Sequence, residues 1–244
     1  MEGDAYLGEL AAGVIYLLAG ARLVLLGART GEAPERLLGA SFAMFGVSGI
    51  LYAVAVFETF SAIETPINFA ARVTYLPSAL LIAVFTARVF RPDGRWARWL
   101  VRGVAVLVVA GVGGSALRGD WEGFSLSNGW FWLEWVGYTL PFGWAAAEAF
   151  PRYLQARRRV SVGLCEPSVC NRMLLWSLFG LIQLLGCVVV IGQYAAYERE
   201  NVFSPSWDIL YGGITLAALV VMWFAFFPPK IYVRWINRTA PASL

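Results

Sequence analysis

Long apolar runs alternate with short polar stretches along the chain. A helix needs about 20 mainly apolar residues to cross the hydrocarbon core of a bilayer, and seven runs approach this length. They are Tyr6–Leu26, Leu37–Phe57, Phe69–Phe90, Trp99–Ala116, Trp130–Phe150, Met173–Tyr194 and Trp207–Phe227. The stretches between them are rich in Gly, Pro, Ser and Asp, which favour turns. The pattern predicts an all-α integral membrane protein, a seven-transmembrane-helix bundle that forms a single domain over residues 1–244.

The fourth run is the weakest of the seven, because Gly111, Gly113 and Gly114 dilute it near its end. If this run lay on the membrane surface, the chain would cross the bilayer six times. The number of crossings decides on which side each polar segment lies, so an independent indicator of sidedness is needed to choose between the two arrangements.

Basic residues supply that indicator, since Lys and Arg concentrate in cytoplasmic segments. With seven crossings, all 19 Lys and Arg except Arg72, Arg118 and Arg199 fall on one side. Six crossings would put Arg-rich segments on both sides. We therefore expect seven crossings in a prokaryotic-type cytoplasmic (inner) membrane, with the N-terminus outside and the C-terminus in the cytoplasm. The first run follows an acidic start rather than the basic start of a signal peptide, so we expect it to be retained.

Composition supports a membrane protein and narrows the chemistry. Hydrophobic residues make up 59% of the chain and charged residues 14%, and the mean hydropathy is +0.64, whereas a soluble domain is about half apolar and a quarter charged. A soluble enzyme, a disordered chain and a disulfide-rich secreted domain are thereby excluded. The chain has no His and a single Lys, Lys230, so most metal, haem and imidazole chemistry lacks its ligands. We expect no enzymatic activity, no metal and no cofactor.

Polar side chains at membrane depth indicate where a ligand could bind, because burying them in lipid is costly. Helical periodicity places Asp208 on one face of the seventh run with Tyr211, and puts Glu134 and Glu148 on one face of the fifth. The candidate ligand-binding residues in the outer half of the bundle are Tyr52, Arg72, Tyr75, Glu134, Tyr138, Gln183, Tyr194, Asp208 and Tyr211. Glu134 is the deepest carboxylate, and Arg72 is its expected counter-ion.

A purely structural interpretation of the same residues is also open. A carboxylate near a helix N-terminus, as at Glu134 or Asp208, is stabilised by the helix dipole, and Tyr and Trp often form a belt at the membrane interface. Glycine recurs every seven residues at Gly13, Gly20 and Gly27 of the first run. We interpret this repeat as a surface for close helix packing.

Seven helices with an outer N-terminus resemble microbial rhodopsins and G-protein-coupled receptors in topology. In the rhodopsins, a lysine four residues after the position of Asp208 binds retinal, but the residue here is Gly212, and Lys230 lies at the inner membrane edge. A covalent retinal pigment is therefore excluded. The chain also lacks the acidic-arginine-aromatic triplet and the Asn-Pro-x-x-Tyr ending of G-protein-coupled receptors. Hydrolases of the adiponectin-receptor type bind zinc through His, and this chain has no His. The resemblance is one of topology, which does not imply function.

The functional expectation is a receptor-like membrane protein. A small apolar or amphiphilic ligand would bind non-covalently in the outer half of the bundle, and the Arg-rich inner loops would contact lipid headgroups or a cytoplasmic or membrane protein partner. Nucleic acid is not an expected partner, because the basic residues are spread over four segments. Two alternatives remain open, a proton-coupled small-molecule transporter and an accessory subunit of a larger membrane complex.

Overall fold

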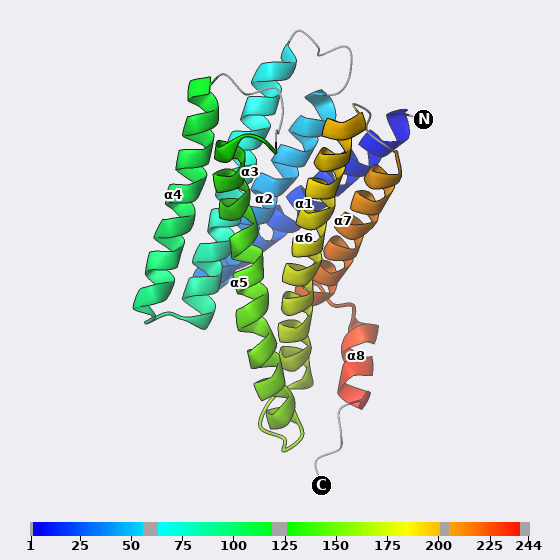
Figure 1. The fold of residues 1–244 in the computed structure, drawn as a ribbon. Helices are drawn as coiled ribbons and strands as arrows, with labels where there is room; N and C mark the ends of the chain where they lie inside the picture. The colour runs from blue at the N-terminus through cyan, green and yellow to red at the C-terminus, as the bar shows by residue number, and fades with distance from the viewer. Residues whose placement is uncertain (1, 56–62, 119–125, 201–204, 240–244) are drawn as a thin grey trace.

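The computed structural model describes residues 2–55, 63–118, 126–200 and 205–239, and this part of the chain is all helical (Figure 1). Its helices are α1 (Glu2–Thr30), α2 (Ala33–Ala55), α3 (Glu64–Phe90), α4 (Arg95–Arg118), α5 (Gly129–Val160), α6 (Pro167–Glu200), α7 (Pro205–Phe226) and α8 (Lys230–Thr239). The seven predicted runs correspond to α1 through α7, although the end of the second run, beyond residue 55, lies outside the described residues. The predicted all-α class is confirmed for the described part of the chain.

Among the described residues, six helices are long and apolar enough to cross a membrane. They are α1 from Leu10, α2, α3, α4, α6 as far as Ala196, and α7 from Ile209. The chain is therefore a helical membrane protein. Our expectation that the fourth run is the weakest is wrong by this measure, because α4 qualifies and α5 does not. Helix α5 carries Glu134 and Glu148 together with several Trp and Tyr, which lower its hydropathy.

Helix α5 extends well beyond the predicted run, which ended at Phe150. The side chain of Asn128 accepts a hydrogen bond from the backbone nitrogen of Trp130 at 3.0 Å and so caps the start of the helix. The last turn contains Arg157, Arg158 and Arg159, whose charges favour a helix C-terminus. At 1.5 Å per residue, α5 is about 48 Å long, whereas a hydrocarbon core is about 30 Å thick.

The sequence pattern did not predict α8, because ten residues are too few to form an apolar run. This helix is amphipathic, with Lys230 and Arg234 on one side and Ile236 buried on the other. The hydroxyl of Tyr232 donates a hydrogen bond to Oδ1 of Asn171 at 3.2 Å, which ties α8 to the first turns of α6. Helix α8 therefore extends the protein at the end where α5 and α6 meet.

The helices form a closed arrangement in which α1 packs on α2, α2 on α3, α5 on α6, α6 on α7, and α7 again on α1. Helix α5 also contacts α3, and α4 packs on both of them. Four described connections, residues 31–32, 91–94, 161–166 and 227–229, lie toward the lower end of the bundle in Figure 1. The basic segments of the chain flank these connections, so they gather at one end of the bundle.

The seam between α1 and α2 is built on glycine. A Cβ on Gly20 would lie 2.7 Å from the carbonyl oxygen of Gly39, and a Cβ on Gly27 would lie 2.9 Å from the backbone nitrogen of Arg36. Gly13 faces the carbonyl oxygen of Gly46 in the same way, at 3.0 Å. The two backbones approach closely only because these positions lack side chains. The predicted packing role of the seven-residue glycine repeat is confirmed.

This seam gives a direct test by substitution. Gly20→Ala should push α1 away from α2 and lower the free energy of unfolding, because the new methyl group would meet the backbone of α2. Overpacking of this kind costs about 1–3 kcal/mol. The matched control is Gly103→Ala in α4, where a Cβ meets nothing within 4 Å and alanine is the better helix former. Denaturation in detergent micelles measures both variants, and equal stability of the two would contradict the close approach.

Candidate functional site

The centre of the site is a buried ion pair between Arg72 of α3 and Glu134 of α5. Nε of Arg72 donates to Oε1 of Glu134 at 2.6 Å, and Nη2 donates to Oε2 at 2.6 Å. Arg72 is only 5% exposed and Glu134 only 3%. The parallel fork of a guanidinium matches the two carboxylate oxygens, which makes this the strongest type of charged hydrogen bond. The expectation that Arg72 is the counter-ion of Glu134 is confirmed.

A third helix completes the surroundings of the pair. Nη2 of Arg72 also donates to the hydroxyl of Ser115 in α4 at 3.3 Å. Helix α4 comes this close because of its glycines, since a Cβ on Gly111 would lie 2.7 Å from the backbone nitrogen of Glu134. On the facing helix, a Cβ on Gly137 would lie 2.9 Å from the side chain of Val108. A glycine that weakens the fourth apolar run therefore lets α4 pack directly against the ion pair.

Two stacked tyrosines lie one helical turn along from the charged pair. The rings of Tyr75 and Tyr138 are 4.2 Å apart between centroids and inclined by 26°. Phe45 of α2 presents its ring edge to Tyr75 at 5.7 Å and to Tyr138 at 6.2 Å. Because Tyr75 follows Arg72 by one turn of α3 and Tyr138 follows Glu134 by one turn of α5, the same two helix faces that hold the charges also hold the stacked rings.

A small cavity opens beside this stack, with about 290 Å³ of empty space. It lies among α3, α5, α6 and α7 and is lined by Tyr75, Trp135, Tyr138, Gln183, Gly186, Cys187, Val190, Tyr211, Ile214 and Thr215. Much of this space belongs to its mouth, so the closed cavity accommodates water-sized groups rather than a large ligand. Four of the candidate residues from the sequence, Tyr75, Tyr138, Gln183 and Tyr211, line it together.

The remaining candidates lie close to these groups, with one exception. Tyr52, on α2, lies near Arg72 and Glu134. It also lies near Tyr194 on α6 and Tyr211 on α7, so α2, α6 and α7 all contribute to the polar cluster. The side chain of Asp208 lies outside the described residues.

Several members of the cluster were not expected from the sequence. The sequence did not single out Ser115, because small hydroxyl residues are common in membrane helices and its partner, Arg72, lies on another helix. Trp135 and Cys187 line the cavity, but nothing in the sequence distinguishes them from ordinary apolar packing residues. Tyr16 of α1 is buried and lies near Tyr211. Glu9, seven residues earlier in the sequence and in phase with Tyr16, is a signal that could have indicated this position.

A second ion pair joins α3 to α5 at the opposite end of the bundle. Nε of Arg91 donates to both carboxylate oxygens of Glu148 at 2.9 and 3.0 Å, and Nε1 of Trp144 donates to Oε1 at 3.4 Å. The hydrogen bond and the charge of Glu148 raise the pKa of Arg91 above its ordinary value. This agrees with the predicted shared face of Glu134 and Glu148, since both carboxylates point to α3.

The polar groups that line the cavity are neutral. The described residues contain no group of three His, Cys, Asp or Glu side chains that could hold a metal ion. Arg72 and Glu134 neutralise each other, so the cavity offers hydrogen bonds from phenol and amide groups rather than net charge. Such a lining can form hydrogen bonds to a small polar group.

The stability of the protein should depend strongly on the inner pair of charges. Arg72→Gln or Glu134→Gln alone leaves one buried charge without its partner, which costs about 3–5 kcal/mol. Arg72→Met combined with Glu134→Leu removes both charges and should recover most of that loss. Unfolding in mixed micelles measures the stability of all three variants. Arg91→Gln, at the pair whose arginine is half-exposed, is a control expected to lose less stability. A single substitution at Arg72 that is no more damaging than Arg91→Gln would contradict the importance of the buried pair.

Comparisons with known proteins assign no family to the chain. No protein-family model, no curated protein and no solved structure matches it. What the described residues show is a helical membrane protein in which a buried ion pair, a tyrosine stack and a small polar cavity occupy one region.

Proposed function

We propose that the chain crosses the membrane seven times, with its N-terminus outside and its basic end in the cytoplasm. The two ion pairs support α5 as the additional crossing. Arg72 lies near the start of α3 and Arg91 directly follows its end, and their partners Glu134 and Glu148 occur in the same order in α5. The two helices therefore run parallel, and about 21 Å of α5 separates its two carboxylates. A helix that accompanies an apolar span over this distance crosses most of the bilayer with it.

Charge distribution supports the orientation. Figure 1 shows the connections at residues 31–32, 91–94, 161–166 and 227–229 toward one end of the bundle, and the basic segments of the sequence flank them. Lys and Arg concentrate on the cytoplasmic side of bacterial-type inner membranes. The buried pair and the cavity then lie toward the outer half.

We further propose that the protein is a receptor-like sensor of a small amphiphilic molecule, without catalysis of its own. The observation that carries this proposal is the convergence of polar side chains from different helices on one cavity beside the buried ion pair. The body of the ligand would pack on Trp135 and on the stack of Tyr75 and Tyr138. Its polar end would meet Gln183 or Tyr211. The transporter and accessory-subunit alternatives stay predictions.

Signal transfer would follow from the rigidity of the α3–α5 pair. A ligand larger than the closed cavity must separate α5 from α6 and α7 on entering. Two ion pairs hold α3 to α5, so both helices would move together. Their inner ends carry Arg91 and the triplet Arg157 to Arg159, where a cytoplasmic protein partner would detect the shift.

Native and introduced cysteines test the topology. Cys165 lies in the α5–α6 connection, whereas Cys170 and Cys187 are buried and can be replaced by serine. A second version carries Ser127→Cys, at the exposed turn before α5, in place of Cys165. Seven crossings with an outer N-terminus predict that an impermeant maleimide labels Ser127→Cys in intact cells, and labels Cys165 only after lysis. Labelling of both sites in intact cells, or of neither, would indicate that α5 does not cross, and the reverse pattern would indicate an inverted protein.

Filling the cavity tests the ligand proposal. A Cβ on Gly186 would lie 3.4 Å from Ile214 and 3.8 Å from Tyr211, so the rest of a leucine side chain would occupy the cavity. Gly186→Leu should abolish retention of a small molecule that mass spectrometry detects in extracts of the purified wild-type protein. Gly213→Leu, on the open side of α7, is the matched control and should retain it. Extracts of wild type and Gly186→Leu with identical contents would contradict the proposal.

A further inference from the structure

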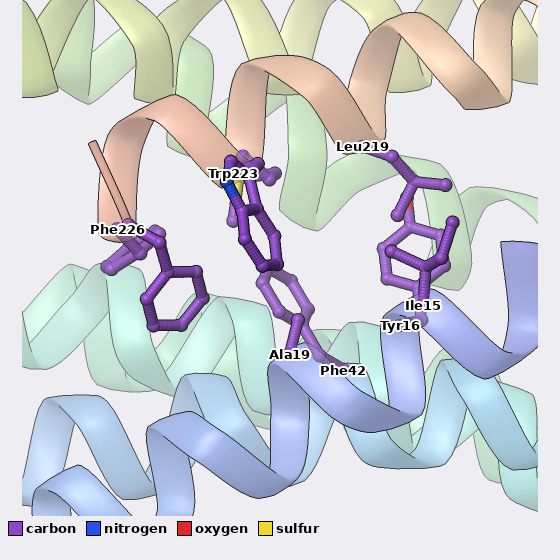
Figure 2. A pocket seen from close by; sticks show the side chains of 9 residues that line it. Ile15, Tyr16, Ala19, Phe42, Leu219, Trp223 and Phe226 are labelled. Carbon is purple, nitrogen blue, oxygen red and sulfur yellow. The ribbon is translucent and has the colours of Figure 1, made fainter. Parts of the chain in front are cut away.

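A second hollow lies on the side of the bundle, between α1 and α7. It is a narrow crevice, open to the side, and is lined by Ile15, Tyr16, Ala19, Phe42, Leu219, Met222, Trp223, Phe226 and Phe227. Figure 2 shows labelled side chains from α1 and from α7 facing each other across this space, with Phe42 of α2 between them. All of these side chains are apolar apart from the hydroxyl of Tyr16 and the indole nitrogen of Trp223. The groove therefore suits a hydrocarbon rather than a polar molecule.

The groove exists because α1 is held elsewhere. The glycine seam fixes α1 closely on α2 along the length of both helices, and α1 runs obliquely across the bundle (Figure 1). It therefore diverges from α7, with which it makes a less extensive interface than with α2. Ala19 is too small to fill the gap, and the half-exposed ring of Trp223 leaves it open to the side.

The positively charged side chain of Arg22 lies at one end of this groove. The guanidinium of Arg22 lies over the ring of Phe227, 4.4 Å from its centroid, and Phe227 itself lines the groove. Arg22 is exposed at the surface of α1, about 12 Å of helix before the end of α1 at Thr30. In the described part of the chain, no carboxylate lies within ion-pair distance of it.

With the proposed topology, Arg22 would lie inside the inner edge of the hydrocarbon. An arginine there without a carboxylate favours contact with an anion from outside the protein. Its long side chain can reach toward the membrane interface, where the phosphate groups of lipids are located. A single molecule that offers an anion at one end and a hydrocarbon chain at the other satisfies both Arg22 and the groove.

We propose that the groove between α1 and α7 is a binding site for one anionic phospholipid, with its phosphate at Arg22 and an acyl chain against Ile15, Ala19 and Trp223. The site is separate from the polar cavity, and its existence does not depend on a ligand there. With the proposed topology, the lipid belongs to the inner leaflet. The chain then fills the α1–α7 seam that the protein itself leaves open.

Native mass spectrometry of the full chain in mild detergent tests this site. Phosphatidylglycerol and phosphatidylcholine with the same oleoyl chains serve as probes. The wild type should retain phosphatidylglycerol more strongly, and Arg22→Gln should reduce that preference about fivefold, since one basic side chain contributes about 1 kcal/mol to binding an anionic lipid. Arg29→Gln is the matched control, because it removes the same charge from nearly the same face of α1 and lies seven residues from Arg22. It should leave the preference unchanged.

A second pair of variants tests the acyl chain. Ala19→Phe fills the groove and should weaken retention of both lipids, whereas Ala21→Phe, on an exposed face of α1, should not. Equal retention of the two lipids by the wild type, an equal effect of Arg22→Gln and Arg29→Gln, or displacement of the lipid by inorganic phosphate alone would each overturn the proposal. Melting temperatures confirm that each variant is folded, and if Ala19→Phe does not fold, the arginine variants still decide the result.

Discussion

The bundle depends on one buried contact, the bidentate ion pair of Arg72 and Glu134. Two unpaired charges at this depth would be prohibitively costly in lipid, so neither α3 nor α5 can leave its neighbour without exposing one of them. The pair thus explains how α5, the least apolar of the first seven helices, is kept inside the protein. Ser115 extends the constraint to α4. The polar cavity and the tyrosine stack lie beside this ion pair.

Glycine has a structural role that complements the charges. In α4, Gly111 brings a third backbone against Glu134, and in α1, Gly20 brings the helix against α2. Each glycine lowers helix propensity by roughly 1 kcal/mol relative to alanine, and close packing offsets this cost. The seam that holds α1 on α2 also prevents α1 from closing on α7. The groove beside Trp223 therefore results from the tight contact between α1 and α2.

Sequence patterns predicted this molecule unevenly, for identifiable reasons. Apolar runs revealed the first seven helices because hydropathy reports contact with lipid, and they failed for α8 and the far end of α5 because those segments need no such contact. Helical periodicity placed Glu134 and Tyr211 near the polar cluster that the structure shows, because the face and depth of a residue follow from regular helix geometry. Ser115 and Cys187 escaped notice because their roles depend on which helices are neighbours, and a single helical pattern contains no such information.

The length of α5 has a mechanical consequence. From Tyr138, beside the cavity, to its end at Val160, the helix measures about 33 Å. A tilt of about 5° pivoting at Tyr138 would therefore sweep the far tip through about 3 Å, a displacement comparable to the helix shifts that operate at subunit interfaces. A helix of this length would act as a lever arm, because a slight widening among the aromatic rings near Tyr138 becomes a larger displacement at the far end of the helix.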